Sequence, residues 1–288
     1  MATVPKYFDS MLTGYRQGLV GRFVHLGHWD EPPVDVNDNA SEFQTAQERL
    51  NQAVIDLAEL QDGQAVLDVG CGFGGTLACI NQSWHNMFLC GVNIDSRQLD
   101  VCAEIVAQHH NWFEWHAADA CALPFRDRYF DRIVCVEAMF HFASRQTFLA
   151  EACRILKPHG ILAVSDMTVT LPYESNAFPW FCAGAIMQDG YGPWPDFGSH
   201  FGKNPQDYQQ LACEVGLELT QVVDATVATR PSHLFTCGQA ECGQAERPVP
   251  ESWSATPDNS LVRAALLLRW LHEHHYLRYW YLQFRKPA

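Results

Sequence analysis

A glycine-rich segment between an apolar run and a helical pattern constrains the fold more than any other feature of this sequence. The segment, residues 67–76, reads Leu-Asp-Val-Gly-Cys-Gly-Phe-Gly-Gly-Thr. Glycines after a strand let the backbone turn sharply, and they let a ligand approach without meeting a Cβ atom. The helix that follows presents free backbone N–H groups to a polar ligand. A strand, a ligand-binding turn and a helix are therefore expected in this order.

The chain around this turn alternates short apolar runs with helical patterns. Such alternation predicts an α/β fold with a parallel sheet and helices on both faces. We expect strands at 65–69, 87–94, 114–117, 132–136, 160–169, 217–224 and 279–284. Helices are expected at 41–60, from the glycine turn to about residue 81, and at 96–108, 145–156, 204–216 and 261–274. Ser41 is the expected N-cap of the first helix, and 229–259 is expected to be mostly loop.

The composition argues against several functional classes. The sequence has 288 residues, with 33 acidic and 19 basic side chains, and a formal charge of −14. This balance argues against broad binding to nucleic acid or to an anionic membrane, because both need a positive surface. No apolar run approaches the ~20 residues of a membrane-spanning helix, and residues 1–30 lack a signal-peptide pattern. The 11 cysteines favour buried free thiols in a reducing cytoplasm, since most lie in apolar runs (Cys90, Cys102, Cys135, Cys153, Cys213).

Two acidic residues indicate which ligand the turn suits. The glycines from Gly70 onward fit the dinucleotide pattern G-x-G-x-x-G, which alone is a weak signal. A dinucleotide site needs an acid at the end of the next strand, where this sequence has Asn93. Asp68, at the tip of the first strand, suits a ligand with an ammonium group and would repel a pyrophosphate. Asp119 follows the third strand, where it could accept a hydrogen bond from an adenine amino group.

These residues, in this order and spacing, resemble the class I S-adenosylmethionine-dependent methyltransferases, in the small-molecule branch that includes natural-product, sterol and tocopherol enzymes. The resemblance covers nearly the whole chain. It implies a doubly wound, mostly parallel seven-stranded sheet whose last strand is antiparallel, and S-adenosylmethionine as the cofactor. Asn93 stands where the family usually has Asp or Glu for the ribose hydroxyls, and Gln98 could share that contact. The implied cofactor-binding residues are Asp68, Gly70, Gly72, Gly74, Asn93, Ile94, Gln98, Asp119, Ala120 and Glu137.

The resemblance also divides the chain into segments. Residues 1–40 would form an N-terminal helical lid, 41–170 the Rossmann-like cofactor-binding core, 171–203 an inserted lid on the acceptor side, and 204–288 the completion of the core sheet, with a loop insertion near 229–259. The sequence His-Leu-Gly-His-Trp at 25–29 is similar to a His-Leu-Gly-Tyr-Trp lid element of small-molecule members. The inserted lid is rich in aromatic residues, which favours a largely apolar or ring-bearing acceptor. Candidate acceptor contacts are His25, His28, Trp180, Phe181, Tyr191 and Trp194.

The chemistry implied by the resemblance requires the protein mainly to align the reactants and to supply a base. A sulfonium methyl group is already activated, so the enzyme chiefly places nucleophile, methyl carbon and sulfur in line. A hydroxyl acceptor also benefits from a base within hydrogen-bond reach. His141 is the preferred base and Glu137 the second candidate, as base, cation stabiliser or cofactor contact, although packing alone would also explain His141. We expect O-methylation of a hydroxyl on a hydrophobic polyketide or peptide natural product.

Other functions stay open at this point. C-methylation of an isoprenoid or sterol-like alkene would use Glu137 to stabilise a carbocation or remove a proton, and N-methylation of an amine is a third option. An NAD-dependent dehydrogenase and a non-enzymatic binding module are the alternatives from other classes. No metal site is expected, because His272-Glu273-His274-His275 is interpreted as a solvated helix end and Cys237 and Cys242 lack a second pair at zinc spacing. Asp166 is expected to face substrate or solvent.

Overall fold

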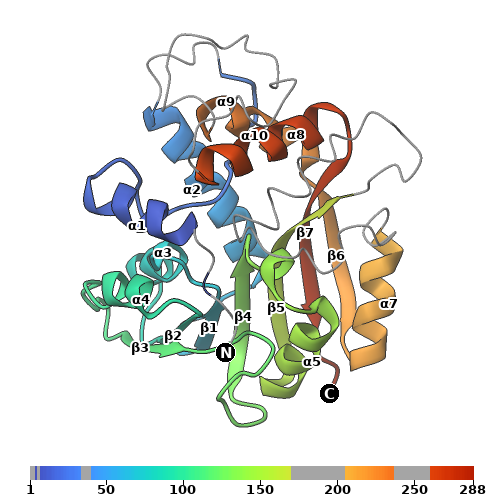
Figure 1. The fold of residues 1–288 in the computed structure, drawn as a ribbon. Coiled ribbons are helices and arrows are strands. Elements are labelled where there is room, and N and C mark those ends of the chain that lie inside the picture. Colours follow the sequence, from blue (N-terminus) through green and yellow to red (C-terminus); the bar gives the residue numbers. More distant parts are fainter. Residues whose placement is uncertain (1–3, 5–6, 34–39, 170–204, 237–259) are drawn as a thin grey trace.

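The computed structural model describes residues 4, 7–33, 40–169, 205–236 and 260–288 (Figure 1). In this part of the chain, seven strands form one sheet in the order β3-β2-β1-β4-β5-β7-β6. The first five strands pair in parallel, and β7 runs antiparallel to both β5 and β6. The strands are β1 Ala65–Val69, β2 Phe88–Asn93, β3 Trp112–Ala117, β4 Phe130–Val136, β5 Leu156–Val169, β6 Glu218–Asp224 and β7 Leu277–Arg285. The predicted doubly wound sheet with an antiparallel last strand is confirmed.

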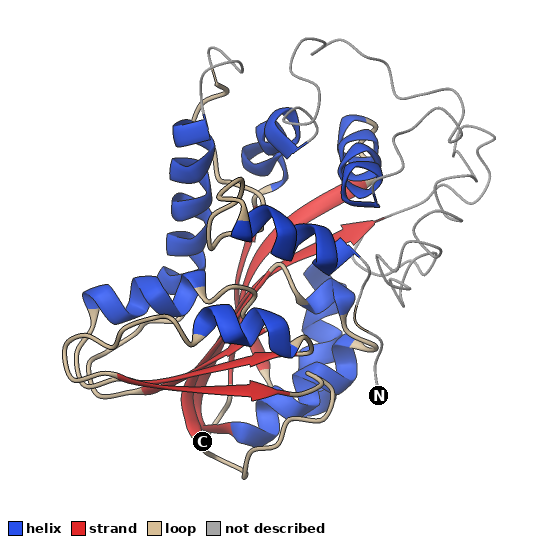
Figure 2. Ribbon diagram, turned by 60° about the vertical axis from the view of Figure 1, so that its left-hand side comes forward, coloured by secondary structure: helices blue, strands red, loops and turns tan. Residues whose placement is uncertain are grey.

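Helices cover both faces of this sheet (Figure 2). Successive side chains of a strand point to opposite faces, so neighbouring apolar residues enter different cores. Val66 of β1 packs with Ile55 and Leu77 from α2 and α3, whereas Leu67 faces the core that contains Phe148 of α5. The helices are α1 Tyr7–Arg16, α2 Ala40–Leu57, α3 Gly75–Ser83, α4 Ser96–Cys102, η1 Met139–His141, α5 Arg145–Ile155, α7 Pro205–Val215, α8 Thr226–Thr229, η2 Arg230–Ser232, α9 His233–Thr236 and α10 Ser260–Glu273.

Several predicted boundaries were wrong, and tertiary contacts explain one of them. The helix predicted at 96–108 ends at Cys102, because the side chain of Asn81 on α3 binds the carbonyl of Val106 at 3.0 Å and the N–H of Gln108 at 2.9 Å. Helix α2 begins at Ala40, so Ser41 lies inside its first turn and is not the N-cap. The segment expected as loop from 229 begins with the short helices η2 and α9. Strand β5 begins at Leu156, before the expected start of this strand at residue 160.

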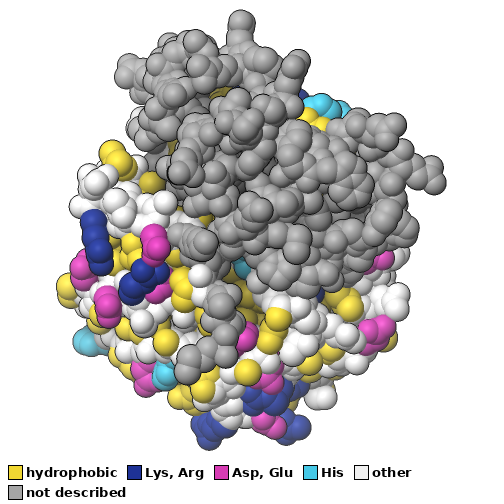
Figure 3. Space-filling model, viewed as in Figure 1, with side chains coloured by type: hydrophobic (Ala, Val, Ile, Leu, Met, Phe, Trp, Pro, Cys, Tyr) yellow, Lys and Arg dark blue, Asp and Glu magenta, His cyan; other side chains and the backbone are white. Residues whose placement is uncertain are grey.

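Charges of both signs lie on the described surface, and half of the described cysteines are buried. On the described part of the face in Figure 3, acidic and basic side chains lie interspersed. The eight cysteines of the described segments are free; Cys71, Cys90, Cys102 and Cys135 are buried, whereas Cys213 is exposed on α7, contrary to expectation. None of the described helices has both the length and the apolar character needed to cross a membrane.

Candidate functional site

The glycine turn lies at the carboxyl end of β1, beside the ends of β2 and β4. Gly70, Gly72 and Gly74 have φ angles of 79°, 53° and 78°, a region that side chains with a Cβ atom avoid. A Cβ atom on Gly70 would lie 2.3 Å from the Cβ of Ala138, which follows β4. The N–H groups of Gly70 and Cys71 donate to Val92 O at 2.8 and 3.0 Å, and these bonds fold the turn over the end of β2. Glycine is therefore required here by both conformation and space.

Asp68 lies under this turn with an unsatisfied carboxylate. Its side chain is buried, and Oδ2 has no hydrogen-bond partner among the described residues. Burial away from water raises the pKa of Asp68 from 3.8 to about 7. A buried carboxylate without a partner is costly, and a cationic ligand would relieve that cost. The arrangement suits the ammonium group expected at this position.

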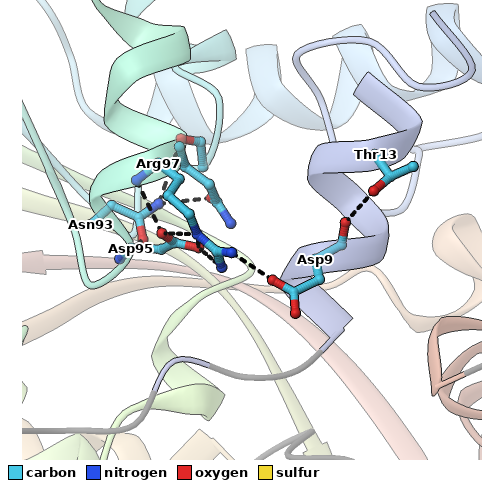
Figure 4. Close-up of polar contacts among 7 residues, drawn as sticks. Asp9, Thr13, Asn93, Asp95 and Arg97 are labelled. Carbon is cyan, nitrogen blue, oxygen red and sulfur yellow. Dashed lines mark hydrogen bonds and ion pairs between the residues drawn. The ribbon is translucent and has the colours of Figure 1, made fainter. Parts of the chain in front are cut away.

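Two amides stand at the end of β2. Asn93 and Gln98 are both buried, and Asn93 Nδ2 donates to Gln98 Oε1 at 2.9 Å. The next residues form a series of ion pairs, in which Asp95 binds Arg97 and Arg97 binds Asp9 of α1 at 2.6 Å (Figure 4). These ion pairs connect the N-terminal helix to the loop that follows β2. Ile94 lies half-buried in the same loop.

The end of β3 places Asp119 and Ala120 on the same edge of the sheet. Asp119 Oδ1 accepts a hydrogen bond from Cys121 N at 2.8 Å, which closes a local turn. Ala120 is buried in the core that contains Val92 and Ala138. The geometry leaves the second carboxylate oxygen of Asp119 without a hydrogen bond to the described residues, so it can accept one from a ligand.

Glu137, the residue after β4, has a strained backbone and two hydrogen bonds to one oxygen. Its φ is 47°, uncommon for a residue with a Cβ, and its N–H donates to Ser165 Oγ at 2.9 Å. Its Oε1 accepts from Leu26 N at 2.8 Å and from the Tyr279 hydroxyl at 2.7 Å. Burial raises the pKa of Glu137 to about 7 despite these two bonds. Strain of this kind concentrates at functional sites.

His141 ends the short helix η1 and meets the N-terminal helix. The hydroxyl of Tyr7, on α1, lies 3.2 Å from His141 Nε2. Burial, and secondarily the charge of Arg145, lowers the pKa of His141 to about 3, so the imidazole is neutral at physiological pH. Sequence reasoning missed Tyr7, because nothing in the first helix connects it with a residue 134 positions away.

Residues 23–29 form a strap that crosses the site, buried at residues 25–27 and 29 but exposed at Val24, and it carries His25 and His28. Gln47 Nε2 on α2 donates to His25 O at 2.7 Å, while Trp29 N donates to Ala228 O at 2.9 Å. His25 Nδ1 lies 2.7 Å from Leu26 O, which fixes the proton on Nδ1, and burial lowers the pKa of His25 to about 4. His28 Nδ1 lies 2.9 Å from the Tyr281 hydroxyl. The strap therefore brings Leu26 N–H and two imidazoles to the same end of the sheet.

One serine holds the strap from the other side. Ser232 Oγ accepts from Gly27 N at 2.8 Å and from Trp29 Nε1 at 3.0 Å, and it lies 3.2 Å from Gly27 O, to which it donates. Ser232 is completely buried, so its hydroxyl has satisfied all its hydrogen-bonding capacity inside the protein. No sequence motif singled it out.

The chain is similar to known proteins of one family. Residues 67–164 match the family model described as "Methyltransferase domain". A 2-methyl-6-phytyl-1,4-hydroquinone methyltransferase from Synechocystis is 32% identical over 244 residues, which cover 80% of this chain and 73% of that protein. The chain is a class I S-adenosylmethionine-dependent methyltransferase.

Two further comparisons agree with this assignment. The O-methyltransferase resE of Aspergillus sclerotiorum is 28% identical over 234 residues, 78% of each chain. The solved structure of geranyl diphosphate C-methyltransferase from Streptomyces coelicolor A3(2), in complex with Mg²⁺, geranyl diphosphate and S-adenosyl-L-homocysteine, superposes with a TM-score of 0.67 at 14% identity, covering 99% of this chain and 100% of that one. At that identity the superposition shows the shared fold. The methyltransferase uses S-adenosylmethionine and acts on small molecules.

The residues at the edge of the sheet fit this cofactor. Asp68 offers an unpartnered buried acceptor for an ammonium group, and Gln98 Nε2 is a buried donor with no partner among the described residues. Both lie beside a turn whose glycines leave no Cβ in the way. The fit supports a cofactor-binding role for Asp68, Gln98 and the glycines of the turn, and the roles of all the predicted cofactor-binding residues stay a proposal.

The structure corrects two interpretations of the methyltransferase sequence. Asp166 meets neither substrate nor solvent, because it is fully buried in β5 and binds Arg145 at 2.7 Å and the Tyr208 hydroxyl at 2.6 Å. His272 is not solvated, because it lies buried between His233 and the carbonyl of Thr226. Trp180, Phe181, Tyr191, Trp194, Cys237 and Cys242 lie outside the described residues. Within the described segments, no three metal-ligating side chains come together.

Proposed function

We propose that this methyltransferase transfers a methyl group to a hydroxyl of a hydrophobic specialised metabolite, a polyketide or peptide natural product, with Glu137 as the proton acceptor. The observation that carries the proposal is the state of Glu137. A carboxyl group with a pKa of about 7 is matched to proton transfer near neutral pH, whereas His141, with a pKa of about 3, is a weak base. His141, the base favoured by sequence, is thus assigned an orienting role with Tyr7.

The residues around Glu137 support this role. Leu26 N–H and the Tyr279 hydroxyl both bind Oε1, which holds the carboxyl group in one orientation. Its other oxygen has no hydrogen bond to the described residues and can take the hydroxyl proton of an acceptor. When bound, S-adenosylmethionine supplies an electrophilic methyl group on a sulfonium centre. Tyr7 and His141 would then help to place the accepting oxygen, because they lie beyond the same strand end.

A neutral, ring-bearing acceptor agrees with the charges of the site and with the relatives. Arg145, whose charge acts on His141, is ion-paired with Asp166, which makes it a poor partner for an anionic acceptor. One relative is named as an O-methyltransferase, and another is named for a phytyl-substituted hydroquinone, a hydrophobic ring with two hydroxyls. His25, His28, Trp180, Phe181, Tyr191 and Trp194 remain the proposed acceptor contacts. Residues 1–40 and 171–203 remain the proposed lids.

The test is methyl transfer from methyl-¹³C-labelled S-adenosylmethionine to a panel of hydroxylated polyketides, peptides and prenylated hydroquinones. We expect a product with the mass of one added methyl group and a ¹³C signal of a methoxy carbon. Glu137→Gln should lower turnover about 100-fold, because general-base catalysis contributes on that scale. Its affinity for S-adenosylhomocysteine should stay within about twofold. Glu48→Gln, on the exposed face of α2, is the matched control.

C-methylation is the second candidate, and the same acid favours it. A buried carboxyl group of raised pKa can also accept a proton from carbon or stabilise a cation. A labelled methyl group bound to carbon in the product would replace the O-methylation proposal by this one. Full turnover by Glu137→Gln would show that Glu137 is required for neither O-methylation nor C-methylation.

A further inference from the structure

The glycine turn contains one large side chain, that of Phe73, and the N-terminal helix helps to bury it. Phe73 is completely buried and packs with Leu12 of α1 and Val101 of α4. Its ring centroid lies 4.8 Å from that of Tyr15, which is also on α1. Helix α1 lies next to α3 and α4 (Figure 1). The side chain of Phe73 therefore connects the glycine turn to α1.

Arg22, which follows α1 in the chain, binds the backbone of the same residue. Its Nη1 atom donates to Phe73 O at 2.8 Å and to Val101 O at 3.3 Å. Nη1 carries two hydrogens, so both bonds can form together. The guanidinium carbon lies 5.8 Å from the ring centroid of Tyr15, and Nη2 lies 3.9 Å from Glu104 Oε2. One cation thus bridges the carbonyl groups of the glycine turn and of the last turn of α4.

These two hydrogen bonds are suited to fixing the backbone of the turn. Hydrogen bonds from an ionised donor are stronger than those between neutral groups. The guanidinium group of Arg22 also keeps its proton at every physiological pH, so its donors are always present. The side chain is only 27% exposed, which limits competition from water.

The two residues after Arg22 contact the glycine turn through packing. A Cβ atom on Gly75 would lie 2.7 Å from two atoms of the Phe23 ring. A Cβ atom on Gly72 would lie 3.6 Å from Val24 Cγ2. The start of the strap therefore follows the turn closely, and substitution of Arg22 would leave these packing contacts in place.

We propose that Arg22 is a positioning residue for the methyl donor, because it holds the glycine turn in the conformation that binds S-adenosylmethionine. Gly72 and Gly74, on either side of Phe73, have positive φ angles and many other accessible conformations, so this part of the turn needs an external restraint. A site that is formed in only a fraction of the molecules binds its ligand more weakly by that fraction. The proposal rests on the cofactor-binding role proposed for the turn, and it does not depend on which acceptor is methylated.

Calorimetric titration of Arg22 variants with S-adenosylhomocysteine tests the proposal. Arg22→Met keeps an unbranched side chain and removes the guanidinium group. If about one molecule in ten then retains the binding conformation of the turn, affinity falls about tenfold. Arg22→Lys keeps the charge but lacks the planar fork of donors, and it should lose about threefold. Arg16→Met, at an exposed position on α1, is the matched control and should bind like the wild type.

Hydrogen exchange followed by mass spectrometry separates a local effect on the turn from a loss of overall stability. Within the turn, Gly74 N donates to Cys71 O at 2.8 Å, so opening of the turn exposes this amide to exchange. In Arg22→Met, a peptide spanning residues 70–78 should exchange about tenfold faster than in the wild type. A peptide spanning residues 88–93, in β2, should keep its wild-type rate.

Wild-type affinity of Arg22→Met would overturn the proposal, whatever the exchange of the turn, because binding would not need the restraint. Equal acceleration in both peptides would overturn it by showing that Arg22 stabilises the fold as a whole. Weaker binding with unchanged exchange in the turn would do the same, because Arg22 would then act on the ligand directly. None of these measurements uses a methyl acceptor, so failure of the proposed O-methylation is distinguishable from failure of this inference.

Discussion

The two halves of the site are built in different ways. The donor half, which is proposed to hold the methyl donor, comprises residues 67–120 with the glycine turn. Except for its contacts with Asp9 and Arg22, the polar contacts described for it lie within this stretch: Asn93 and Gln98 are five positions apart, and Asp119 and Cys121 are two apart. The acceptor half, which is proposed to hold the methyl acceptor around Glu137, joins distant segments. Leu26 and Tyr279 reach Glu137 from 111 and 142 positions away, and Ser232 reaches Gly27 across 205.

The halves also differ in which of their polar groups are satisfied within the protein. The donor half leaves Asp68 Oδ2 and Gln98 Nε2 buried and without partners among the described residues. In the acceptor half, Ser232 Oγ and Glu137 Oε1 each take part in more than one hydrogen bond, although His25 Nε2 is also buried without a partner among the described residues. We therefore expect a ligand to complete the donor half, whereas tertiary contacts already fix the framework around Glu137 and Ser232 in the acceptor half. Substitutions should therefore affect binding in one half and stability in the other.

The largest effect is expected from Asp68→Asn. We expect affinity for S-adenosylhomocysteine to fall about 100-fold, because a charge-assisted hydrogen bond is lost. Stability should change in the opposite direction. The folded-state pKa of about 7 lies above the ordinary 3.8, so wild-type stability falls as pH rises from about 4 to 7, and the variant escapes that loss.

Calorimetry measures the affinity of Asp68→Asn, and urea unfolding at pH 5 and pH 8 measures its stability. The gain in stability of the variant over the wild type should be larger at pH 8. Asp100→Asn, an exposed acid on α4, should change neither quantity. Normal affinity of Asp68→Asn for S-adenosylhomocysteine would contradict the role given to Asp68 in the donor half.

In the acceptor half, Gly27→Ala should destabilise the fold by about 1–3 kcal/mol. A Cβ atom there would lie 2.5 Å from the Cβ of Ala46 and 2.9 Å from its carbonyl carbon, so the strap must move off α2. Gly21→Ala is the matched control, since a Cβ atom on Gly21 meets nothing within 4 Å. Urea denaturation of both variants checks this, and equal stability of the two would show that the strap is not held as tightly as its contacts indicate.

Acid should weaken the segment that holds the strap. Burial is the main cause that lowers the pKa of both His233 and His272, so the folded state excludes protons that the unfolded chain binds below about pH 6.5. Each imidazole then contributes a loss of up to about 1.4 kcal/mol per pH unit as pH falls from 6.5 toward 4. The raised pKa values of Asp68 and Glu137 act in the opposite direction over this range.

A comparison with His272→Gln isolates the histidine contribution. Its unfolding free energy should depend less steeply on pH between 6.5 and 4.5 than that of the wild type. His110→Gln, at an exposed position, should retain the wild-type slope. If the slope of His272→Gln is also unchanged, the buried pair does not titrate on unfolding.

The smallest effect is expected where the two halves are joined by an exposed ion pair. Asp9→Asn removes the 2.6 Å contact to Arg97, which is solvent-accessible on both sides, and should cost under about 1 kcal/mol. Hydrogen exchange of the α1 amides, with and without S-adenosylhomocysteine, measures whether loss of this ion pair destabilises α1. A loss of cofactor affinity beyond tenfold would show that the halves are coupled through α1 far more strongly than an exposed pair permits.

Much of the donor half could be predicted from sequence, because its geometry is local. The glycines and Asp68 were placed correctly at the end of β1, and the seven-stranded sheet with its antiparallel last strand followed from the family resemblance. The acceptor half could not be predicted in the same way. Tyr7 and Ser232 carry no local signal of their contacts with His141 and Gly27, and Asp166 and His272 were assigned to surfaces although both are buried.

The alternation of strands and helices and the position of the cofactor turn can be predicted from local sequence, because hydrophobic periodicity and glycine conformation act over a few neighbouring residues. The protonation tendencies of Glu137 and His141 depend on the tertiary structure, because segments far apart in the sequence bury these two side chains. Burial shifts the pKa of a side chain because the surrounding segments exclude water and so disfavour its charged form, and these segments come together only when the chain folds.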